Sequence, residues 1–404
     1  MIKMFDCGII GAGIAGSFAA LKLAKEHKNI KTILFDLGRP PMKRRRQLEG
    51  WLGCLPNSDG KLYINDILKV SELTGIRKAK SAYNYFEKTL SNIDTLKIIR
   101  DKMPSISMEK KLKKNGYTIS LNDHYQIYPK DIHALSKYMS NIIEQNTDIT
   151  YSFDNEIKSI IKKDDMFIVT TEEKEVFHCK KLILAVGRSG WRWANEIFSK
   201  LGIIKDNNIA RFGIKIELNS NVLKDFNKST CSLTKDNFEI GPFNWHGSVI
   251  PEDHLDMAIS AFRSNENRWK TDKVSFNMIG NIECPNNGFE QTDRLGKLTF
   301  VLANDRVIKE RVNTILTDKS RISIIPEYNW LKSPIKELSE VIPEISTKAY
   351  FHVPTILPLA SKINIKNNME TDIEGLFVVG ESAGITGIIS AGITGIIAAD
   401  MITK

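Results

Sequence analysis

The chain has 404 residues, 42% of them hydrophobic and 26% charged, a composition typical of a globular protein with about two domains. No apolar run reaches the roughly 18–20 residues that span a bilayer, and no signal-peptide cleavage site precedes the first glycines, so we expect a cytoplasmic protein without a membrane span. The formal net charge of +9 fits either nucleic-acid binding or the Lys-rich composition of an AT-rich genome. The five scattered cysteines have no CxxC or Cys/His spacing, so we expect no metal site.

The N-terminus has the pattern of a βαβ unit. Residues 5–10 form a short apolar strand, a glycine-rich turn follows, residues 17–27 have helical periodicity, and residues 31–38 form a second strand. A βαβ unit of this length is typical of a parallel, nucleotide-binding sheet.

The middle of the chain changes from a helical to an alternating pattern. Residues 66–147 are mainly helical, with short extended pieces at Tyr117–Ser120 and His124–Tyr128. From Ile149 the alternation predicts a strand, then a three-stranded meander with a turn at Lys163–Asp165, and finally a buried strand at Leu182–Gly187.

The remaining sequence predicts a second domain and a return to the first. Residues 211–330 contain less helix and more strand-like runs, among them 297–303, and residues 375–402 are again a strand, a glycine turn and an apolar helix. We predict an α/β fold, in which a Rossmann-like domain with a parallel sheet and a three-stranded meander carries a smaller β-rich domain. The predicted boundaries are 1–210 and 350–404 for the first domain, with a helical insertion at about 66–124, and 211–349 for the second, a substrate or cap domain.

The first motif, Gly11-Ala12-Gly13-Ile14-Ala15-Gly16, follows the first strand and opens the first helix. Gly11 permits the tight turn, Gly13 lets the backbone approach a diphosphate, and Gly16 allows the helix to pack closely on the sheet. The helix N-terminus offers N–H groups and a positive dipole end to the anion. Asp36 ends the second strand, where a carboxylate accepts hydrogen bonds from ribose hydroxyls. These residues predict a dinucleotide site.

Two further strand ends have the same glycine-rich character. Leu182–Gly187 is followed by Arg188–Trp191, and Gly375–Glu381 is followed by a turn of small residues that starts the last helix. The N–H groups at that helix start could face an anion or the carbonyl-rich edge of a ring. We predict that these distant segments converge with the first motif on one cofactor.

Five blocks together resemble a known group of proteins: Gly11–Gly16 with Asp36, Ser58–Tyr63, Leu182–Trp191, Ala210–Leu218 and Gly375–Ala391. They are similar to a group of largely uncharacterised FAD-dependent dehydrogenases among the glutathione-reductase-like and glycine-oxidase-like flavoproteins. A more distant resemblance is to the FAD-dependent enzymes that modify tRNA uridine. The resemblance implies FAD as the cofactor and an oxidoreductase activity.

The resemblance also implies which residues hold FAD. For the adenine and diphosphate half it implies Gly11, Gly13, Ala15, Gly16, Asp36, Ile157, Ala185 and Gly187; beside the cofactor Arg44, Arg45, Ser58 and Lys61; and along the ribityl chain and the ring Gly380, Glu381, Gly387, Ile388 and Ile389. The sequence departs from the group at Phe243–Gly247 and at His352–Pro358, where a substrate face is expected, so the substrate of the group does not transfer.

Candidate catalytic side chains are His352, His246 and Trp245. A histidine beside the flavin could act as a general acid or base near neutral pH, and Trp245 could stack on a planar substrate. A hydrogen-bonded structural histidine and a core tryptophan are the alternative interpretations.

Three functions fit these observations. The first is an FAD-dependent oxidoreductase that transfers a hydride from a small or medium-sized organic substrate to flavin N5. The second is an FAD-dependent enzyme that oxidises a nucleobase, or cleaves a C–N bond of its amine-bearing modification, in DNA or tRNA; the third is a non-catalytic FAD-binding subunit. No second GxGxxG motif is present, so NAD(P)H would meet the flavin only transiently, or oxygen or another carrier would reoxidise it.

Overall fold

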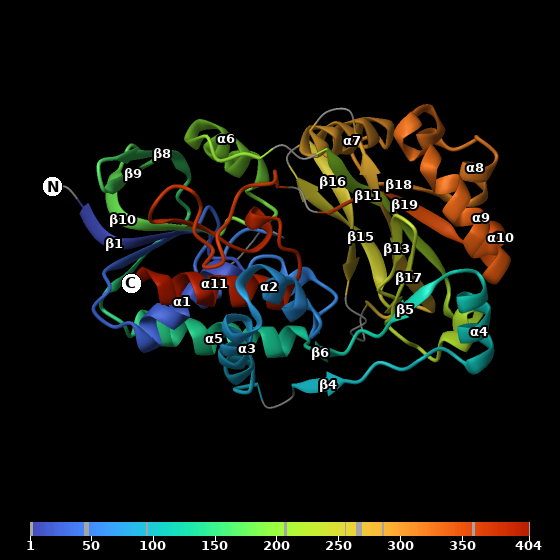
Figure 1. Ribbon diagram of the computed structural model, residues 1–404, viewed down its shortest axis with the longest axis horizontal. Helices are drawn as coiled ribbons and strands as arrows, with labels where there is room; N and C mark the ends of the chain where they lie inside the picture. The colour runs from blue at the N-terminus through green and yellow to red at the C-terminus, as the bar shows by residue number, and fades with distance from the viewer. Residues whose placement is uncertain are drawn as a thin grey trace.

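Two large β-sheets, each with helices packed against it, form the two halves of the protein in the computed structural model, and two smaller sheets accompany them (Figure 1). The structure describes residues 3–43, 48–93, 96–205, 208–254, 256–263, 269–284, 287–357 and 360–403. The parallel sheet and the mixed α/β architecture that the sequence predicts are both present.

The strands of the first sheet are β1 (Lys3–Ile10), β2 (Thr32–Phe35), β7 (Ile149–Ser152), β8 (Ile157–Lys163), β9 (Met166–Thr171), β10 (Val176–Leu184) and β20 (Leu376–Val378). Their order is β7-β2-β1-β10, and β20 and β9 both pair with β10, with β8 beyond β9. Five strands run parallel: β7, β2, β1, β10 and β20. Strands β8, β9 and β10 form the predicted antiparallel meander. The buried strand predicted at its end is a continuation of β10.

Helices cover both faces of the first sheet; they are α1 (Ile14–Glu26), α6 (Trp191–Leu201) and α11 (Ile388–Ile402). Successive side chains of a strand point to opposite faces, so that Leu34 packs with α1 and α11 while Ile33 packs with α6. Helices α1 and α11 lie side by side (Figure 1), so close that a Cβ on Gly395 would be 2.0 Å from the Ala15 carbonyl oxygen. This contact holds the C-terminal block against the first glycine motif.

The predicted helical insertion contains α2 (Asp66–Thr74), α3 (Ile76–Leu90), α4 (Ile106–Lys114) and also β4 (Lys97–Ile99) and β5 (Thr118–Ser120). Strand β4 and strand β3 (Lys61–Tyr63) flank β6 (His124–Gln126) in a small antiparallel sheet. Helix α3 packs on α11, and α5 (Pro129–Glu144) packs on α1. The α4–β5 segment instead belongs to the other half of the molecule, where β5 pairs with a strand of the second sheet.

The strands of the second half are β11 (Ile209–Asn219), β12 (Ser232–Lys235), β13 (Phe238–Ile240), β14 (Asn244–Trp245), β15 (Ser248–His254), β16 (Met257–Arg263), β17 (Lys273–Glu283), β18 (Ile308–Arg311) and β19 (Tyr350–Ile356). The second sheet has the antiparallel order β18-β19-β11-β17-β13-β12-β5, with β14 on β17 and a separate β15–β16 hairpin beside it. Residues 350–356, for which the sequence predicts a place in the first domain, pair within the second sheet.

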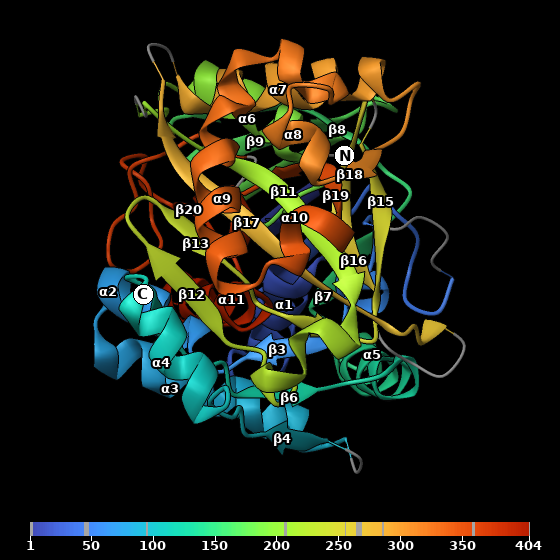
Figure 2. The ribbon, with the colours of Figure 1, turned by 90° about the vertical axis from the view of Figure 1, so that its right-hand side faces the viewer.

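Helices α7 (Gly288–Leu302), α8 (Asn313–Leu316), α9 (Lys332–Val341) and α10 (Glu344–Lys348) pack on the second sheet, and Figure 2 shows α9 and α10 in front of β11 and β17. The prediction of a strand at 297–303 was wrong, because most of this run is the last part of α7. Thr299, Phe300 and Val301 favour strands in isolation. The buried positions Leu295 and Thr299, however, are one helical turn apart and face the sheet.

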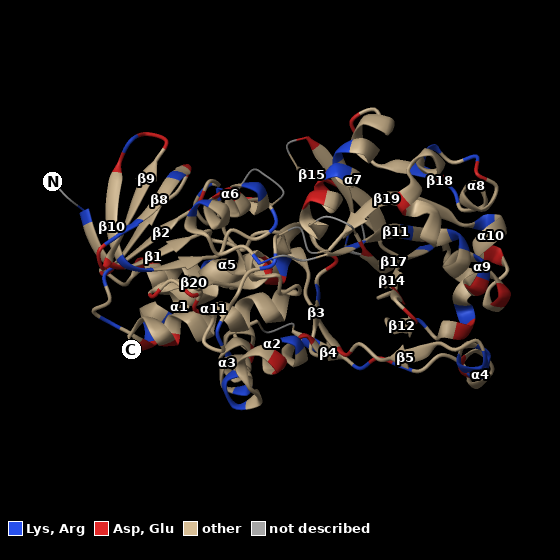
Figure 3. Ribbon diagram, turned by 45° about the horizontal axis from the view of Figure 1, so that its top comes forward, with Lys and Arg blue, Asp and Glu red and all other residues tan. Residues whose placement is uncertain are grey.

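Charged residues gather on the helices and loops, whereas most strand positions are uncharged (Figure 3). Lys215 and Glu217 on β11 are charged strand residues that are also buried, with exposed fractions of 5% and 4%. Among the described helices, none combines the length and the apolar character needed to cross a bilayer.

Candidate functional site

The first glycine motif forms the turn between β1 and α1. Gly11 has a φ of +103°, and a Cβ there would be 2.4 Å from the Ala185 carbonyl oxygen, so only glycine fits. Helix α1 begins at Ile14 without a side-chain cap at Gly13. Its first N–H groups are therefore available to a ligand at the positive end of the helix dipole.

The Asp36 carboxylate connects this turn to the following loop. Oδ2 accepts a hydrogen bond from Ala12 N at 2.6 Å, and Oδ1 accepts from Gly38 N at 2.6 Å and from Gly50 N at 2.9 Å. The side chain is 9% exposed and lines two adjoining cavities. Asp36 therefore shapes the wall in which a ribose would lie.

Three adjoining cavities extend from the first sheet to the second. The edge cavity, about 770 Å³, lies beside Ile157 and Trp193. The central cavity, about 760 Å³, lies between the glycine turn and the start of α11, and it shares Gly11 and Asp36 with the edge cavity. The intersheet cavity, about 900 Å³, lies between residues 54–66 and strands β11, β16 and β17, and it shares Cys54, Arg188, Gly387 and Ile388 with the central cavity.

Most of the predicted cofactor residues line these cavities. The central cavity is lined by Gly11, Gly13, Ala15, Asp36, Ala185, Gly187, Gly380, Glu381, Gly387 and Ile388, the edge cavity by Ile157, and the intersheet cavity by Ser58 and Lys61. Gly16 lies behind the wall, where a Cβ would be 1.8 Å from the Gly11 carbonyl oxygen, and Ile389 is fully buried in the core. Arg44 and Arg45 lie outside the described residues.

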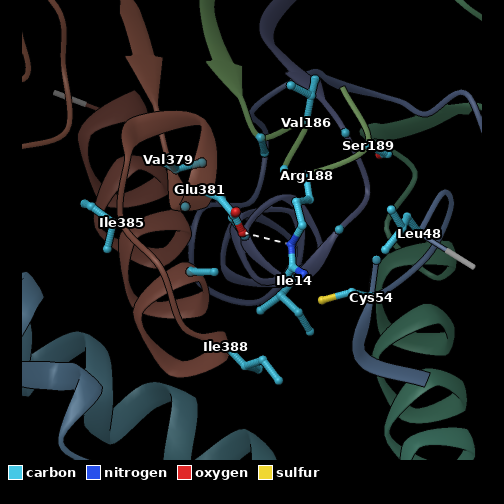
Figure 4. A pocket seen from close by; sticks show the side chains of 18 of the residues that line it. Ile14, Leu48, Cys54, Val186, Arg188, Ser189, Val379, Glu381, Ile385 and Ile388 are labelled. Carbon is cyan, nitrogen blue, oxygen red and sulfur yellow. Dashed lines mark hydrogen bonds and ion pairs between the residues drawn. The ribbon is translucent and has the colours of Figure 1, made fainter. Parts of the chain in front are cut away.

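Arg188, which was not among the predicted site residues, lies at the junction of the central and intersheet cavities. Arg188 Nη1 donates to both carboxylate oxygens of Glu252, at 3.0 and 3.1 Å. Its Nε donates to Glu381 Oε2 at 3.4 Å, as Figure 4 shows. The charge of Glu252 raises the pKa of Arg188 well above its usual value. Burial alone would raise the pKa of Glu252, but Arg188 and His254 outweigh it and lower that pKa to about 2.

The intersheet cavity contains several buried ionisable side chains. Lys61 Nζ lies 3.3 Å from Asp59 Oδ2 and donates to Asn244 Oδ1 at 3.0 Å. Lys215 Nζ donates to Asn277 Oδ1 at 2.6 Å. Burial raises the pKa of Asp66 at the start of α2, although Lys69 opposes the shift. In the part of the chain that the structure describes, no three His, Cys, Asp or Glu side chains form a group that could hold a metal ion.

The central cavity has the features that FAD requires. Two helices, α1 and α11, begin at it without side-chain caps, at Gly13 and Gly387. Their N-termini suit the diphosphate and the electron-rich pyrimidine edge of the flavin. Glu381 Oε1 is buried and has no hydrogen-bond partner among the described residues, so it can accept from a ligand hydroxyl. The residues present therefore fit the cofactor.

A family model described as "Glucose inhibited division protein A" matches residues 6–237, which is more than half of the chain. The chain belongs to the glucose inhibited division protein A family. This member of the family is an FAD-dependent oxidoreductase, and FAD is its cofactor. No curated protein matches the chain.

Solved structures similar to this family member include several enzymes. Glycine oxidase from Geobacillus kaustophilus is 12% identical, with a TM-score of 0.44, over 99% of this chain and 95% of that chain. Halogenase PltM is 13% identical, with a TM-score of 0.47, over 99% and 69% of the two chains. The p-nitrophenol 4-monooxygenase PnpA from Pseudomonas putida DLL-E4 is 9% identical, with a TM-score of 0.41, over 99% and 78%.

The three candidate catalytic side chains of this family member line none of the three cavities. His352 is 4% exposed on β19, with Nε2 at 3.6 Å from Glu217 Oε1, and burial lowers its pKa. The Nδ1 of His246 lies 3.1 Å from the Thr271 carbonyl oxygen. Trp245 donates from Nε1 to the Ser229 carbonyl oxygen at 2.6 Å, within the hydrophobic core of the second half. Each side chain thus has a structural contact in the second half.

Proposed function

We propose that the chain oxidises a small or medium-sized organic substrate, bound in the intersheet cavity, by hydride transfer to flavin N5. The observation that carries the proposal is that the intersheet and central cavities meet at Arg188, Gly387 and Ile388. A substrate in the first cavity would thereby reach the end of a cofactor held in the second. When bound, FAD supplies the hydride acceptor.

The proposal assigns the cofactor contacts by position along the cavities. The N-terminus of α1 at Gly13 would hold the diphosphate, the wall around Asp36 the ribose, and Ile157 the adenine. Glu381, with one buried oxygen unpartnered among the described residues, would accept from the ribityl chain, and the N-terminus of α11 at Gly387 would face the ring. In this assignment the second sheet, including β19, provides the substrate domain.

The walls of the intersheet cavity support substrate binding with little water. Ile259, Phe262 and Ile356 contribute apolar surface to it. The hydroxyl of Tyr63 is buried there and has no hydrogen-bond partner among the described residues. An apolar pocket with a few polar groups is the usual form of a small-molecule site.

A substrate that gives up a hydride also loses a proton, and Asp66 is the carboxyl group best placed to accept it. It is 7% exposed, lines the intersheet cavity and adjoins Gly387, where a Cβ would be 2.2 Å from Asp66 Oδ2. Burial raises its pKa. A carboxylate with a raised pKa is a stronger base than an exposed one.

The test is anaerobic reduction of the FAD-loaded protein by a panel of metabolites, nucleosides, NADH and NADPH, followed by the visible flavin absorbance. We expect one class of organic substrate to bleach the flavin within the mixing time or within seconds. Protein that stays colourless after incubation with FAD, or flavin that no compound except a nicotinamide reduces, would contradict the proposal.

A further inference from the structure

The intersheet cavity contains three cationic side chains, and only two of them have an anionic partner. Arg188 Nη1 lies 3.0 Å from Glu252 Oε1, and Lys61 Nζ lies 3.3 Å from Asp59 Oδ2. Lys215 Nζ instead donates to the neutral amide oxygen of Asn277, at 2.6 Å. No described carboxylate lies within 4.0 Å of Lys215 Nζ.

Lys215 is held in place by the sheet. It lies on β11 directly opposite Asn277 on β17, in the middle of a long antiparallel pairing. The side chain is 5% exposed, and Nζ lies 4.3 Å from the centroid of the Phe262 ring. Both neighbours also line the cavity, so the ammonium group is fixed at the wall and not free to turn to solvent.

A buried ammonium group without a counter-ion is unfavourable, because the protein interior solvates charge poorly. Burial, and next the nearby charge of Arg188, lower the pKa of Lys215 to about 7, although Glu252 and Asp59 oppose the shift. On β19, His352 is a further titratable group that interacts with Lys215. The position would be stabilised by one additional negative charge, which the described protein residues do not supply.

We propose that the substrate is an organic carboxylate whose carboxylate group binds Lys215 Nζ, with Asn277 as the positioning residue for that lysine. The inference rests on the proposed function, since it concerns the same cavity. A single negative charge matches a single unpaired cation, whereas Asp59 and Glu252 would repel a dianion such as a phosphate monoester. The apolar walls at Ile259 and Ile356 would contact the rest of the molecule.

The experiment compares benzoate with its neutral isostere benzamide as probes of the FAD-loaded protein. Binding is measured by calorimetry and by the perturbation of the flavin spectrum. For the wild-type protein at pH 6 we expect benzoate to bind roughly 10- to 100-fold more tightly than benzamide, the range for a charge-assisted hydrogen bond. The variant Lys215→Met should lose this preference. The control Lys158→Met, at an exposed lysine paired with Glu172, should retain it.

The pH dependence in the wild-type protein gives a second, variant-independent test. Only the protonated lysine attracts the anion, so benzoate affinity should fall as the pH rises above about 7, while benzamide affinity stays constant. If Lys215→Met does not hold FAD, this dependence decides the question. Equal affinity of the two probes at pH 6, or a benzoate preference that survives Lys215→Met, would overturn the inference.

These outcomes are separate from failure of the proposed function. A protein whose flavin is reduced by a neutral organic substrate, with no benzoate preference, would leave the oxidoreductase proposal intact and reject the carboxylate. A benzoate preference in a protein whose flavin no organic compound reduces would establish the anion site and reject the hydride-transfer proposal.

Discussion

Replacing Glu252 by Gln should destabilise the protein by removing the charge that compensates Arg188. Glu252 lies on β15 and is 4% exposed. It accepts hydrogen bonds from Arg188 Nη1 at 3.0 and 3.1 Å, and its Oε1 lies 3.1 Å from His254 Nε2. Glutamine has nearly the same shape, so the substitution changes the charge and leaves the packing in place.

The magnitude follows from the pKa of the Glu252 carboxyl. Burial would raise that pKa, but Arg188 and His254 lower it from 4.5 to about 2. Because one pKa unit corresponds to about 1.4 kcal/mol, the ionised carboxylate contributes about 3 kcal/mol to stability at pH 7. A depressed folded-state pKa gives stability that is fully present above pH 4.5 and is lost as the pH falls toward 2. At pH 3.5 about 2 kcal/mol should remain.

Urea unfolding followed by tryptophan fluorescence, at pH 7 and at pH 3.5, measures this difference. The matched control is Glu172→Gln, since Glu172 is 59% exposed in its ion pair with Lys158, and exposed pairs contribute about 0–1 kcal/mol. A smaller loss of unfolding free energy for Glu252→Gln than for the control at pH 7 would contradict the prediction. A loss that stays unchanged between pH 7 and pH 3.5 would also contradict it.

Three further substitutions test other parts of the structure. Gly11→Ala should abolish FAD retention, because its φ is +103° and the new Cβ would be 2.4 Å from the Ala185 carbonyl oxygen; the flavin absorbance of the purified variant reports this. Asp66→Asn should lower the rate of flavin reduction by ~10²- to 10⁴-fold while FAD stays bound. In the wild-type protein the rate of flavin reduction should fall as acidic pH protonates the Asp66 carboxyl. Because burial raises the pKa of Asp66, this fall should occur at a pH above the usual range for Asp. Glu217→Gln should lower the free energy of unfolding in urea by about 2–4 kcal/mol, because it removes the charge of a buried carboxylate that faces three cationic or titratable groups. The distances to Glu217 Oε1 are 3.1 Å from Lys273 Nζ, 2.8 Å from Lys309 Nζ and 3.6 Å from His352 Nε2.

The sequence predicts the cofactor half well because its signals are local. The turn between β1 and α1, the meander β8–β10, and the step from β20 to α11 are each encoded by neighbouring residues. Glycines in these segments, such as Gly11 and Gly387, have a positive φ or a close contact that a side chain would not allow. The positions of the glycines in the sequence therefore indicate the backbone conformation directly. The convergence of the two glycine-rich blocks follows from parallel pairing of β1, β10 and β20.

The second half of the molecule was harder to predict because its contacts join distant segments. The pairing of β19 with β11 and of β5 with β12 depends on the completed sheet. Arg188 follows a predicted motif, but its role depends on Glu252, which lies in a hairpin 64 residues later. Lys215 and Glu217 alternate with Ile214 and Ile216 along the strand, which places the two charges on one face. The same pattern is typical of a solvent-exposed face, and only the folded structure shows that this face is buried. Histidines were predicted as the catalytic side chains because their usual pKa lies near neutral pH. In the structure, burial lowers the pKa of Lys215 to about 7, so a lysine also titrates in this range.

Arg188 connects the central cavity with the intersheet cavity. It follows β10 of the first sheet, and its guanidinium contacts Glu381 beside the start of α11 and Glu252 on the β15–β16 hairpin of the second half. A planar guanidinium can bind two carboxylates at once in fixed directions, which an ammonium group cannot do as rigidly. The hairpin that carries Glu252 also carries Ile259 and Phe262 to the intersheet cavity. Arg188 is therefore one of the side chains that link the walls of the intersheet cavity to the central cavity, and the Arg188–Glu252 pair couples stability to the position of those walls.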